Sequence, residues 1–284
     1  MAELKIIECP RDAMQGWGHF IPTEDKIAYL NQLLRVGFDT IDFGSFVSHK
    51  VIPQMADTAR VAESVDMDDT TSKLLAIVAN IRGAEEAMEF SQIRYLGYPF
   101  SVSPTFQRRN TNSAVEESFE TVVEMHHLAR SYGKEVVIYL SMAFGNPYGD
   151  EWSEKIVLDF AEQVASAGIH TISLADTVGL ATPEEVAILV HETIRHFPDH
   201  EIGVHLHSTS ENWRDKLSAA LDNGCLRFDG AINGYGGCPM SGSDLVGNMN
   251  TGNMVGYFEE RGYLRTIDDD ELQKAEEMAS KIFI

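Results

Sequence analysis

The sequence predicts an α/β protein that closes into a (β/α)8 TIM barrel, one domain over residues 1–284 with extra C-terminal helices over about 252–284. Short apolar runs rich in β-forming residues alternate with longer stretches of helical periodicity, which is typical of βα units around a parallel sheet. This alternation gives eight strand candidates, and 284 residues is the usual size of one such barrel. No linker or low-complexity tract divides the chain.

The expected strands are short apolar or β-branched segments spaced along the whole chain. They cover residues 5–10, 40–44, 72–80, 92–103, 135–144, 170–176, 201–207 and 227–236. Spacing alone does not distinguish a closed barrel from an open doubly wound sheet, so that alternative stays open. The first strand is not followed by a GxGxxG segment, which counts against a dinucleotide-binding fold.

The expected helices lie between these strands. Helical periodicity is clearest over residues 24–36, 115–132, 153–167 and 184–196. Thr23, Ser153 and Thr182 stand at the start of three of these stretches as candidate N-caps. Pro183 follows Thr182 in the first helical turn, a position that proline favours.

Composition limits the class of protein. With 44% hydrophobic and 23% charged residues, the chain has the composition of a globular domain. A net charge of −22 argues against a nucleic-acid partner, because an acidic chain repels phosphate backbones. No apolar stretch approaches the roughly 20 residues of a membrane span. Three scattered cysteines indicate neither a disulfide framework nor a zinc finger, and a reducing cytoplasmic location is expected.

Polar residues follow several of the predicted strands. They are Arg11 and Asp12, Asp42, Asp176, His205 and His207, Cys238, and Asn248. Active sites of (β/α)8 barrels form at the carboxyl ends of the strands. We therefore expect these side chains to meet at one face of the barrel.

The sharpest local signal is the His-Leu-His segment of residues 205–207. Alternate residues of a strand share a face, so both imidazoles can bind one metal ion. The alternative is a pair of hydrogen-bonded histidines inside the barrel. Asp12 and Asn248, expected at the same rim, favour the metal. Mixed nitrogen and oxygen ligands suit Mg²⁺ or Mn²⁺ acting as a Lewis acid.

Arg11 and Cys238 are candidate catalytic groups. Arg11 and Asp12 would face opposite ways on a strand and so have different roles. A fixed guanidinium can stabilise an enolate oxyanion, although a simple ion pair is the ordinary alternative. Cys238 follows two glycines that allow a mobile rim loop, where a thiol can transfer protons. Its alternative is an inert small residue.

Cations near the predicted rim are candidate binding groups for an anionic substrate. Lys50, Arg108 and Arg109 are expected in loops after the second and fourth strands. In so acidic a chain they are candidate attractors for such a substrate. Ordinary surface cations explain them equally well.

Several segments, in order along the chain, resemble the 3-hydroxy-3-methylglutaryl-CoA lyases, within the wider family that includes isopropylmalate and homocitrate synthases. They are Pro10-Arg11-Asp12 with Gln15, Ser45-Phe46-Val47-Ser48 with Pro53-Gln54-Met55, Asn110 with Glu116-Glu117-Ser118-Phe119, Ile172-Ser173-Leu174 with Asp176-Thr177 and Gly179, His205-Leu206-His207, and Gly236-Gly237-Cys238-Pro239 with Gly247-Asn248. The Ser-Phe-Val-Ser and Gly-Gly-Cys-Pro segments favour the lyases over the synthases.

The resemblance implies a retro-Claisen cleavage of 3-hydroxy-3-methylglutaryl-CoA to acetoacetate and acetyl-CoA, a reaction of leucine degradation. It also implies a homodimer and an acyl-CoA substrate, for whose phosphates Lys50, Arg108 and Arg109 are the candidate attractors. No membrane partner is expected, because the chain has no apolar stretch of membrane-spanning length. The implied metal ligands are Asp12, His205, His207 and Asn248. In the implied catalytic set, Arg11 stabilises the enolate, Asp42 and Cys238 share the proton transfers, His205 takes part, and Gln15 and Asp176 support substrate binding.

The sequence departs from the lyase pattern in three places. Position 42 is aspartate where the lyases usually have glutamate, which shortens the side chain by one methylene. Ala13-Met14 replaces Gly-Leu, and Ser208 to Glu211 replace Asp-Thr-x-Gly. Two alternatives therefore stay open: a lyase or aldolase for a related branched 3-hydroxy acid or acyl-CoA, and a non-catalytic metal-binding barrel.

Overall fold

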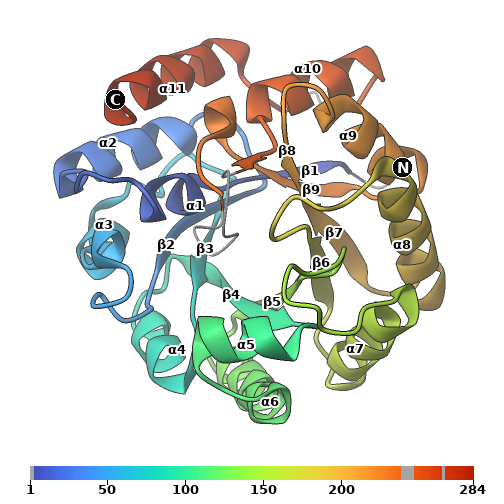
Figure 1. Cartoon of the computed structure of the whole chain (residues 1–284). Coiled ribbons are helices and arrows are strands. Elements are labelled where there is room, and N and C mark those ends of the chain that lie inside the picture. Colours follow the sequence, from blue (N-terminus) through green and yellow to red (C-terminus); the bar gives the residue numbers. More distant parts are fainter. Residues whose placement is uncertain (1–2, 238–245, 264–265) are drawn as a thin grey trace.

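The computed structural model describes residues 3–237, 246–263 and 266–284, and its main sheet is a closed parallel barrel (Figure 1). The barrel strands, in order, are β1 (Lys5–Glu8), β2 (Thr40–Ser45), β3 (Lys73–Ile77), β4 (Ile93–Ser101), β5 (Glu135–Ser141), β6 (Thr171–Ala175), β7 (Glu201–His205) and β9 (Arg227–Gly230). β1 pairs with β9 from Lys5↔Arg227 to Glu8↔Gly230, which closes the sheet. The prediction of a (β/α)8 barrel is confirmed, and the open-sheet alternative is wrong.

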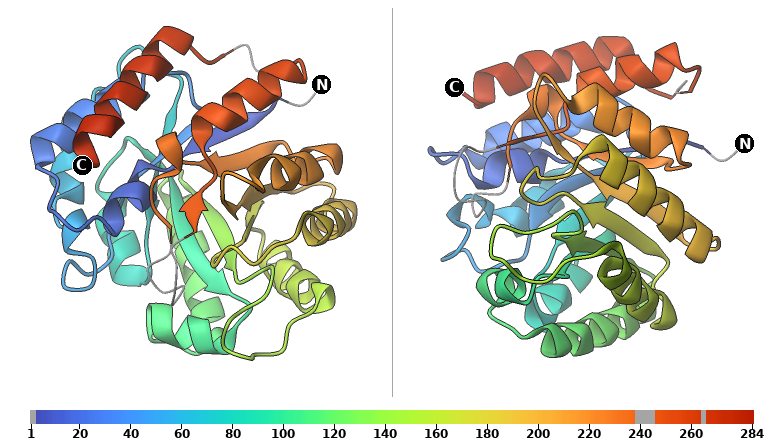
Figure 2. Two further views of the ribbon diagram at one scale, coloured as in Figure 1. Left: turned by 45° about the horizontal axis from the view of Figure 1, so that its top comes forward. Right: turned by 45° about the vertical axis from the view of Figure 1, so that its right-hand side comes forward.

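Helices surround the barrel (Figures 1 and 2). They are α1 (Pro10–Gln15), α2 (Thr23–Leu33), α3 (Thr58–Ser64), α4 (Ile81–Met88), α5 (Pro104–Thr111), α6 (Val115–Ser131), α7 (Glu154–Ser166), α8 (Pro183–His196), α9 (Trp213–Asp222), α10 (Thr251–Glu260) and α11 (Asp269–Ile282), with 3-10 turns η1 (Pro53–Met55) and η2 (Ile232–Gly234). Each long helix buries one apolar face; α7, for example, buries Val157, Ala161 and Val164. None of the helices in the described ranges has the length and apolarity needed to cross a membrane.

Two of the three predicted N-caps are confirmed. Ser153 Oγ accepts a hydrogen bond from Ile156 N at 3.3 Å. Thr182 forms a capping box with Glu185, and Pro183 occupies the first position of α8. The prediction for Thr23 is wrong, because Thr23 is itself the first residue of α2 and Pro22 precedes it without a side-chain cap.

Seven of the eight predicted strands end earlier than expected, and two of these ends affect the site. Pro10 begins α1, so Arg11 and Asp12 lie on a short helix and not on a strand. β7 stops at His205, and His207 belongs to β8 (His207–Ser208), which pairs antiparallel with β10 (Gly247–Asn248). The prediction that the two histidines share one barrel strand is therefore wrong.

The C-terminal helices complete the ring, as predicted. α11 lies beside α2 (Figure 2), where Gln32 Nε2 donates to the Glu271 backbone oxygen at 2.9 Å. The Phe283 ring contacts Trp17 and Tyr235, with ring centroids 5.2 and 4.7 Å apart. Phe283 thus packs against Tyr235 in the segment that follows β9.

Glu8 is a fully buried carboxyl group at the end of β1. Its Oε1 accepts from Ile232 N at 2.9 Å, and its Oε2 lies 2.5 Å from Thr251 Oγ1. Burial raises the pKa of Glu8 to about 8, against the lowering effect of these hydrogen bonds. The folded protein therefore carries a neutral Glu8 at pH 7, which joins β1 to η2 and α10.

This neutral carboxyl predicts a pH dependence of stability. The pKa of Glu8 rises from 4.5 to about 8 on folding, so unfolding releases a proton between these values and stability is lost as pH rises. The free energy of unfolding should fall by about 1.4 kcal/mol per pH unit in this window from Glu8 alone. The variant Glu8→Gln resembles the neutral acid, and urea unfolding across this window should give a flatter curve. A slope as steep as that of the parent would contradict a neutral Glu8.

Candidate active site

A cavity of about 170 Å³ opens at the carboxyl ends of the barrel strands. Its polar lining residues are Arg11, Asp12, Gln15, Asn110, Tyr139, Ser141, Thr177, His205 and His207. Its apolar lining residues are Val47, Val51, Ile52, Ile77, Ala79, Pro99, Phe106 and Ala175. This is the end of a barrel at which active sites form, and it holds much of the polar set expected there.

Asp12 is the centre of the polar cluster. Its Oδ1 accepts hydrogen bonds from Arg11 Nη1 and Gln15 Nε2, both at 2.8 Å. Its Oδ2 accepts from Asn248 Nδ2 at 2.7 Å. Burial would raise the pKa of Asp12, but the charges of Arg11 and the histidines, with the Asn248 bond, lower it to about 2. Asp12 is therefore a carboxylate at neutral pH.

His205 and His207 face Asp12 across the cavity. One potential ligand atom from each of these three residues lies within 4.8 Å of the others. Burial lowers the pKa of His207 to about 4, so its ring is neutral at pH 7. Its Nε2 is buried without a hydrogen-bond partner, which is unfavourable unless another group binds it. A carboxylate and two imidazoles arranged in this way fit a divalent cation.

Asn248 lies on β10, and its side chain contacts the cluster. It pairs with His207 across the two strands, and its amide nitrogen donates to Asp12 and to Tyr235 O at 2.9 Å. Its amide oxygen is the atom left to bind a cation. Gly236 lets the chain pass close by: at φ +94°, a Cβ there would lie 2.7 Å from Asn248 Nδ2 and 2.8 Å from Asp12 O.

Arg11 lies between two carboxylates. Its Nε and Nη2 donate to Asp42 Oδ2 at 3.1 and 2.5 Å, while Nη1 donates to Asp12. The prediction that Arg11 and Asp12 face opposite ways is wrong: both residues lie on α1, and their side chains contact each other. Burial raises the pKa of Asp42 to about 6, against the opposing charge of Arg11. Asp42 is 1% exposed and lies outside the cavity lining, behind Arg11.

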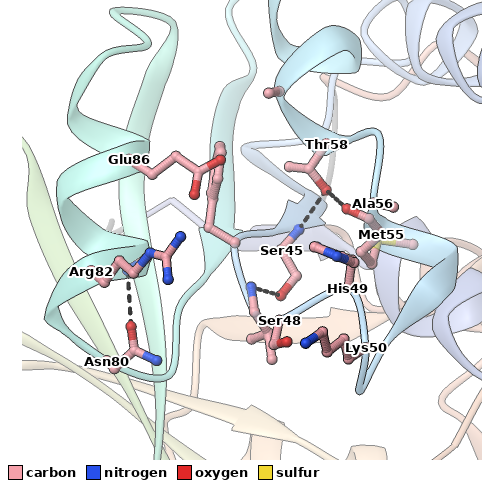
Figure 3. A pocket seen from close by; sticks show the side chains of 14 residues that line it. Ser45, Ser48, His49, Lys50, Met55, Ala56, Thr58, Asn80, Arg82 and Glu86 are labelled. Carbon is pink, nitrogen blue, oxygen red and sulfur yellow. Dashed lines mark hydrogen bonds between the residues drawn. The ribbon is translucent and has the colours of Figure 1, made fainter.

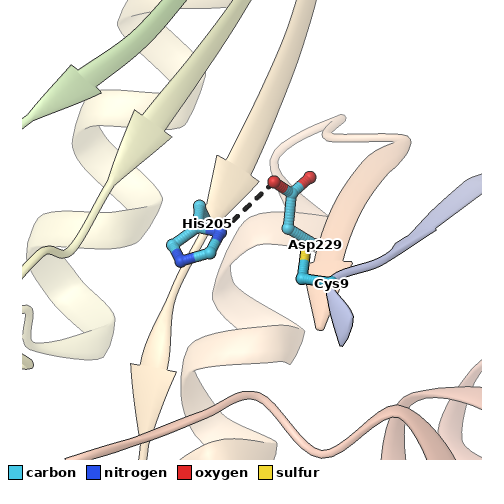
Figure 4. A group of neighbouring side chains, drawn as sticks. All are labelled: Cys9, His205 and Asp229. Atoms are coloured by element: carbon cyan, nitrogen blue, oxygen red, sulfur yellow. Dashed lines mark hydrogen bonds and ion pairs between the residues drawn. The ribbon is translucent and has the colours of Figure 1, made fainter. Parts of the chain in front are cut away.

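A second group of side chains lies beneath the cluster, inside the barrel. His205 Nδ1 is 3.2 Å from Asp229 Oδ2 on β9, and Cys9 lies beside them (Figure 4). Burial would lower the pKa of His205, yet the hydrogen bond and charge of Asp229 raise it above its ordinary value. Asp229 was not predicted from the sequence.

The other predicted residues have different positions. Gln15 lines the cavity, whereas Asp176 lies outside the lining and binds Lys216 Nζ at 2.7 Å. Lys216 also donates to His207 O at 2.8 Å, so Asp176 contacts the histidine segment through it. Cys238 lies outside the described residues.

Arg108 and Arg109 lie in the last turn of α5, and so the prediction that they lie in a loop is wrong. The Arg109 guanidinium lies 4.6 Å from the centre of the Tyr148 ring. Phe106 and Asn110, one helical turn apart on α5, line the cavity instead. The two arginines are exposed and border the cavity without lining it.

Lys50 lines a neighbouring cleft of about 410 Å³ that shares Val47 with the cavity. Lys50 and His49, from the segment after β2, point towards Arg82 at the start of α4 (Figure 3). Glu86 is the one acidic side chain in the lining. Two cationic side chains and an imidazole thus line one cleft next to the cavity in an acidic protein.

Tyr139 and Ser141 are cavity residues that the sequence analysis missed. They lie two residues apart at the end of β5 and therefore share its inward face. The Tyr139 ring packs edge-on against His205, with centroids 5.9 Å apart. Polar side chains at alternate positions of an otherwise apolar strand were the signal that could have identified them.

The chain matches the model of the HMGL-like family over residues 4–279. It is 34% identical to the hydroxymethylglutaryl-CoA lyase YngG of Bacillus subtilis over 88% of this chain and 83% of that one. It is 30% identical to the cytoplasmic 3-hydroxy-3-methylglutaryl-CoA lyase of Rattus norvegicus, over 98% and 80%. A lyase of Pseudomonas aeruginosa, named for 3-hydroxy-3-isohexenylglutaryl-CoA and hydroxymethylglutaryl-CoA, is 30% identical over 87% and 82%.

Solved structures agree with these relatives. An HMG-CoA lyase of Acinetobacter baumannii, in complex with coenzyme A and 3-methylmalate, superposes with a TM-score of 0.92 at 30% identity. The match covers 99% of this chain and 91% of that one. The HMG-CoA lyase of Brucella melitensis gives the same TM-score and identity, over 100% and 99%.

Proposed function

The chain belongs to the HMGL-like family, and we propose that it is a divalent-metal-dependent carbon–carbon lyase that cleaves 3-hydroxy-3-methylglutaryl-CoA into acetoacetate and acetyl-CoA. One observation carries the proposal: Asp12, His205 and His207 form a cluster of metal-ligand type in one cavity with Arg11. The identity to named lyases over most of both chains supports the same reaction.

The reaction removes the proton of the 3-hydroxyl group, breaks the bond between C2 and C3, and leaves an enolate that is protonated at carbon. A divalent cation bound to Asp12, His205, His207 and the Asn248 amide oxygen would lower the pKa of the 3-hydroxyl group. Mixed nitrogen and oxygen ligands favour Mg²⁺ or Mn²⁺.

Arg11 is suited to bind the enolate oxygen. A guanidinium has five N–H donors, and contacts with Asp42 and Asp12 occupy one on each of its three nitrogens. One donor on each terminal nitrogen stays available to the cavity. Because the two carboxylates fix the guanidinium plane, these donors are oriented before the substrate binds, which is the condition for strong oxyanion stabilisation.

The proton transfers are proposed for Asp42 and Cys238, as the resemblance implies. In the described arrangement the Asp42 carboxylate binds Arg11 and lies behind it, so its direct contribution is to hold Arg11 in place. A proton transfer by Asp42 requires its carboxyl group to reach the cavity. Cys238 follows Gly236 and Gly237 in the sequence, and its role as proton donor is proposed from this position and from the family resemblance.

A related acyl-CoA with a larger 3-alkyl group is the second candidate substrate. The apolar lining includes Val47, Val51 and Phe106, which offer contacts to a hydrocarbon chain. One 30% identical relative is named for the isohexenyl substrate. A non-catalytic metal-binding barrel is disfavoured, because metal binding alone does not require Arg11 in the cavity.

Release of acetyl-CoA distinguishes these candidates. The purified protein with Mg²⁺ or Mn²⁺ is given the 3-methyl substrate, a 3-isohexenyl analogue and a control thioester that lacks the 3-hydroxyl group. Cleavage of the 3-methyl compound with the highest kcat/KM supports the proposal, and preference for the longer chain supports the second candidate. Failure to release acetyl-CoA from any substrate would refute both.

The phosphates of the CoA carrier are proposed to bind the cleft of Lys50, His49 and Arg82. This cleft adjoins the cavity at Val47, so a thioester in the cavity can extend into it. Arg82 lies in the first turn of α4, where the helix dipole also favours an anion. Lys50 is favoured as a phosphate-binding residue because it lines this cleft, whereas Arg108 and Arg109 lie on α5 outside it.

Charge reversal tests this cleft. The double variant Lys50→Glu with Arg82→Glu is expected to raise KM by about 10-fold at low salt, because the new carboxylates repel the CoA phosphates and salt screens this repulsion. The kcat should be nearly unchanged, because the variant affects substrate binding and not the reacting groups. The matched control, Arg108→Glu with Arg109→Glu, should change KM less. KM is measured from low to high ionic strength. A larger and salt-dependent effect in the control would place the phosphates at α5.

A reducing, cytoplasmic location is also proposed, supported by the buried free thiols of Cys9 and Cys225. A homodimer is proposed from the family resemblance and is tested by light scattering of the purified chain.

A further inference from the structure

We propose that Asp229 is a positioning residue that holds His205 in the ring orientation and tautomer needed to bind the metal. The inference rests on the proposed metal site and adds a residue to it. Asp229 lies on β9, with a side chain that is 0% exposed, and its Oδ2 is 3.2 Å from His205 Nδ1. Figure 4 shows the other ring nitrogen of His205 pointing away from Asp229.

The hydrogen bond determines which ring nitrogen is free. A carboxylate oxygen can only accept, so Nδ1 must carry the proton and donate it to Asp229. In neutral His205 the proton is then absent from Nε2, which leaves a lone pair there for a cation shared with Asp12 and His207. Without Asp229 the ring would be free to rotate or to protonate Nε2, and the ligand would be lost for part of the time.

A buried carboxylate needs compensating charge, and Arg227 on the same strand carries a buried opposite charge. Arg227 and Asp229 are alternate residues of β9 and share its inward face, and Arg227 is 2% exposed. Burial lowers the pKa of Arg227, but the surrounding acidic groups, Asp229 first among them, together raise it above its ordinary value. Gly203 on β7 makes room for the aliphatic part of the Arg227 side chain, because a Cβ there would lie 2.8 Å from Arg227 Cδ.

The same geometry has a competing explanation, an inner metal site formed by Cys9, His205 and Asp229. Their ligand atoms also lie within 4.8 Å of one another. Two observations disfavour it. Cys9 Sγ is 3.7 Å from Ile7 O and is placed to donate to it, as a protonated thiol does. His205 Nδ1 cannot donate to Asp229 and bind a metal at once.

Mn²⁺ titration of the full chain tests the proposal. The parent should bind one Mn²⁺ per chain, and Asp229→Asn should weaken binding by about 10- to 100-fold, the usual effect of removing a carboxylate behind a metal-bound histidine. Cys9→Ala is the matched control: it removes a neighbour of equal burial and should leave Mn²⁺ affinity unchanged. Thermal unfolding of each variant without metal verifies folding.

The ring proton of His205 gives a second readout that needs no Asp229 variant. In ¹⁵N-histidine-labelled parent protein without metal, assigned by comparison with His205→Gln, the His205 signals should show a protonated Nδ1. A His205 tautomer protonated only at Nε2 would overturn the proposal. Equal Mn²⁺ affinity of Asp229→Asn and parent would overturn it while leaving the metal site intact. Two Mn²⁺ per parent chain, with one lost in Cys9→Ala, would establish the inner site instead. A parent that binds no Mn²⁺ would refute the proposed metal site itself.

Discussion

Replacing His205 by alanine is expected to weaken Mn²⁺ binding by about 10-fold or more and to abolish measurable cleavage. The variant removes one of the three proposed ligands that lie together in the described cavity. It also leaves the Asp229 carboxylate buried without its hydrogen-bond partner. Mn²⁺ affinity is measured by calorimetry, and activity by acetyl-CoA release with saturating metal.

His196 provides the matched control for this variant. It lies at the end of α8, on the side of the barrel away from the cavity, and its side chain is 45% exposed. His196→Ala should therefore leave both Mn²⁺ affinity and turnover as in the parent. Parental Mn²⁺ affinity in His205→Ala would show that the proposed ligand set is wrong, whatever its activity.

The barrel could be predicted because strands of a parallel sheet are buried on both faces. β5 shows this most clearly: its sequence Glu135-Val-Val-Ile-Tyr-Leu-Ser141 is almost continuously apolar, and the structure buries it along nearly its whole length. Between the strands, helical periodicity and capping residues indicated where the long helices begin. Closure was inferred from the number of units, and the β1–β9 pairing bears it out.

Strand ends could not be predicted, because they depend on contacts that are distant in sequence. Apolar character continues past Glu8 through Cys9 and Pro10, yet proline lacks an N–H group and begins a helix there. The β8 strand forms only because β10 comes back from about 40 residues later to pair with it. A two-residue strand has no periodicity of its own.

The site could be predicted only in part. Asp12 lies just after β1, and His205 and His207 lie at and just after the end of β7, so the rule that strand ends gather at one face was enough to group them. Asp229 and Arg227 lie within a strand, and which of its residues face the barrel axis depends on register and tilt. A local signal existed: two ionisable residues at alternate positions around the buried Phe228 are unusual in a core strand.

The structure places Arg11 differently from the sequence prediction, and its proposed role changes with the placement. On a strand it would have faced away from Asp12, and its role would have been separate. On α1 it joins Asp12 to Asp42, so the carboxylate proposed as a metal ligand and the proposed oxyanion donor are held by one network. The short side chain at position 42 is consistent with this role, because it already reaches Arg11 with both oxygens.

Replacing Arg11 by methionine is therefore expected to lower kcat by at least about 100-fold, the usual effect of losing one oxyanion donor, while Mn²⁺ affinity is not reduced. The variant removes no ligand and removes a positive charge that repels the cation. Asp12, whose pKa is about 2 in the parent, should stay ionised at pH 7. Arg11→Lys keeps the charge without the planar fork and should recover only part of kcat. Turnover of the methionine variant near that of the parent would show that other groups stabilise the enolate, and the hydrogen bonds of Arg11 would then serve only to hold Asp12 and Asp42 together.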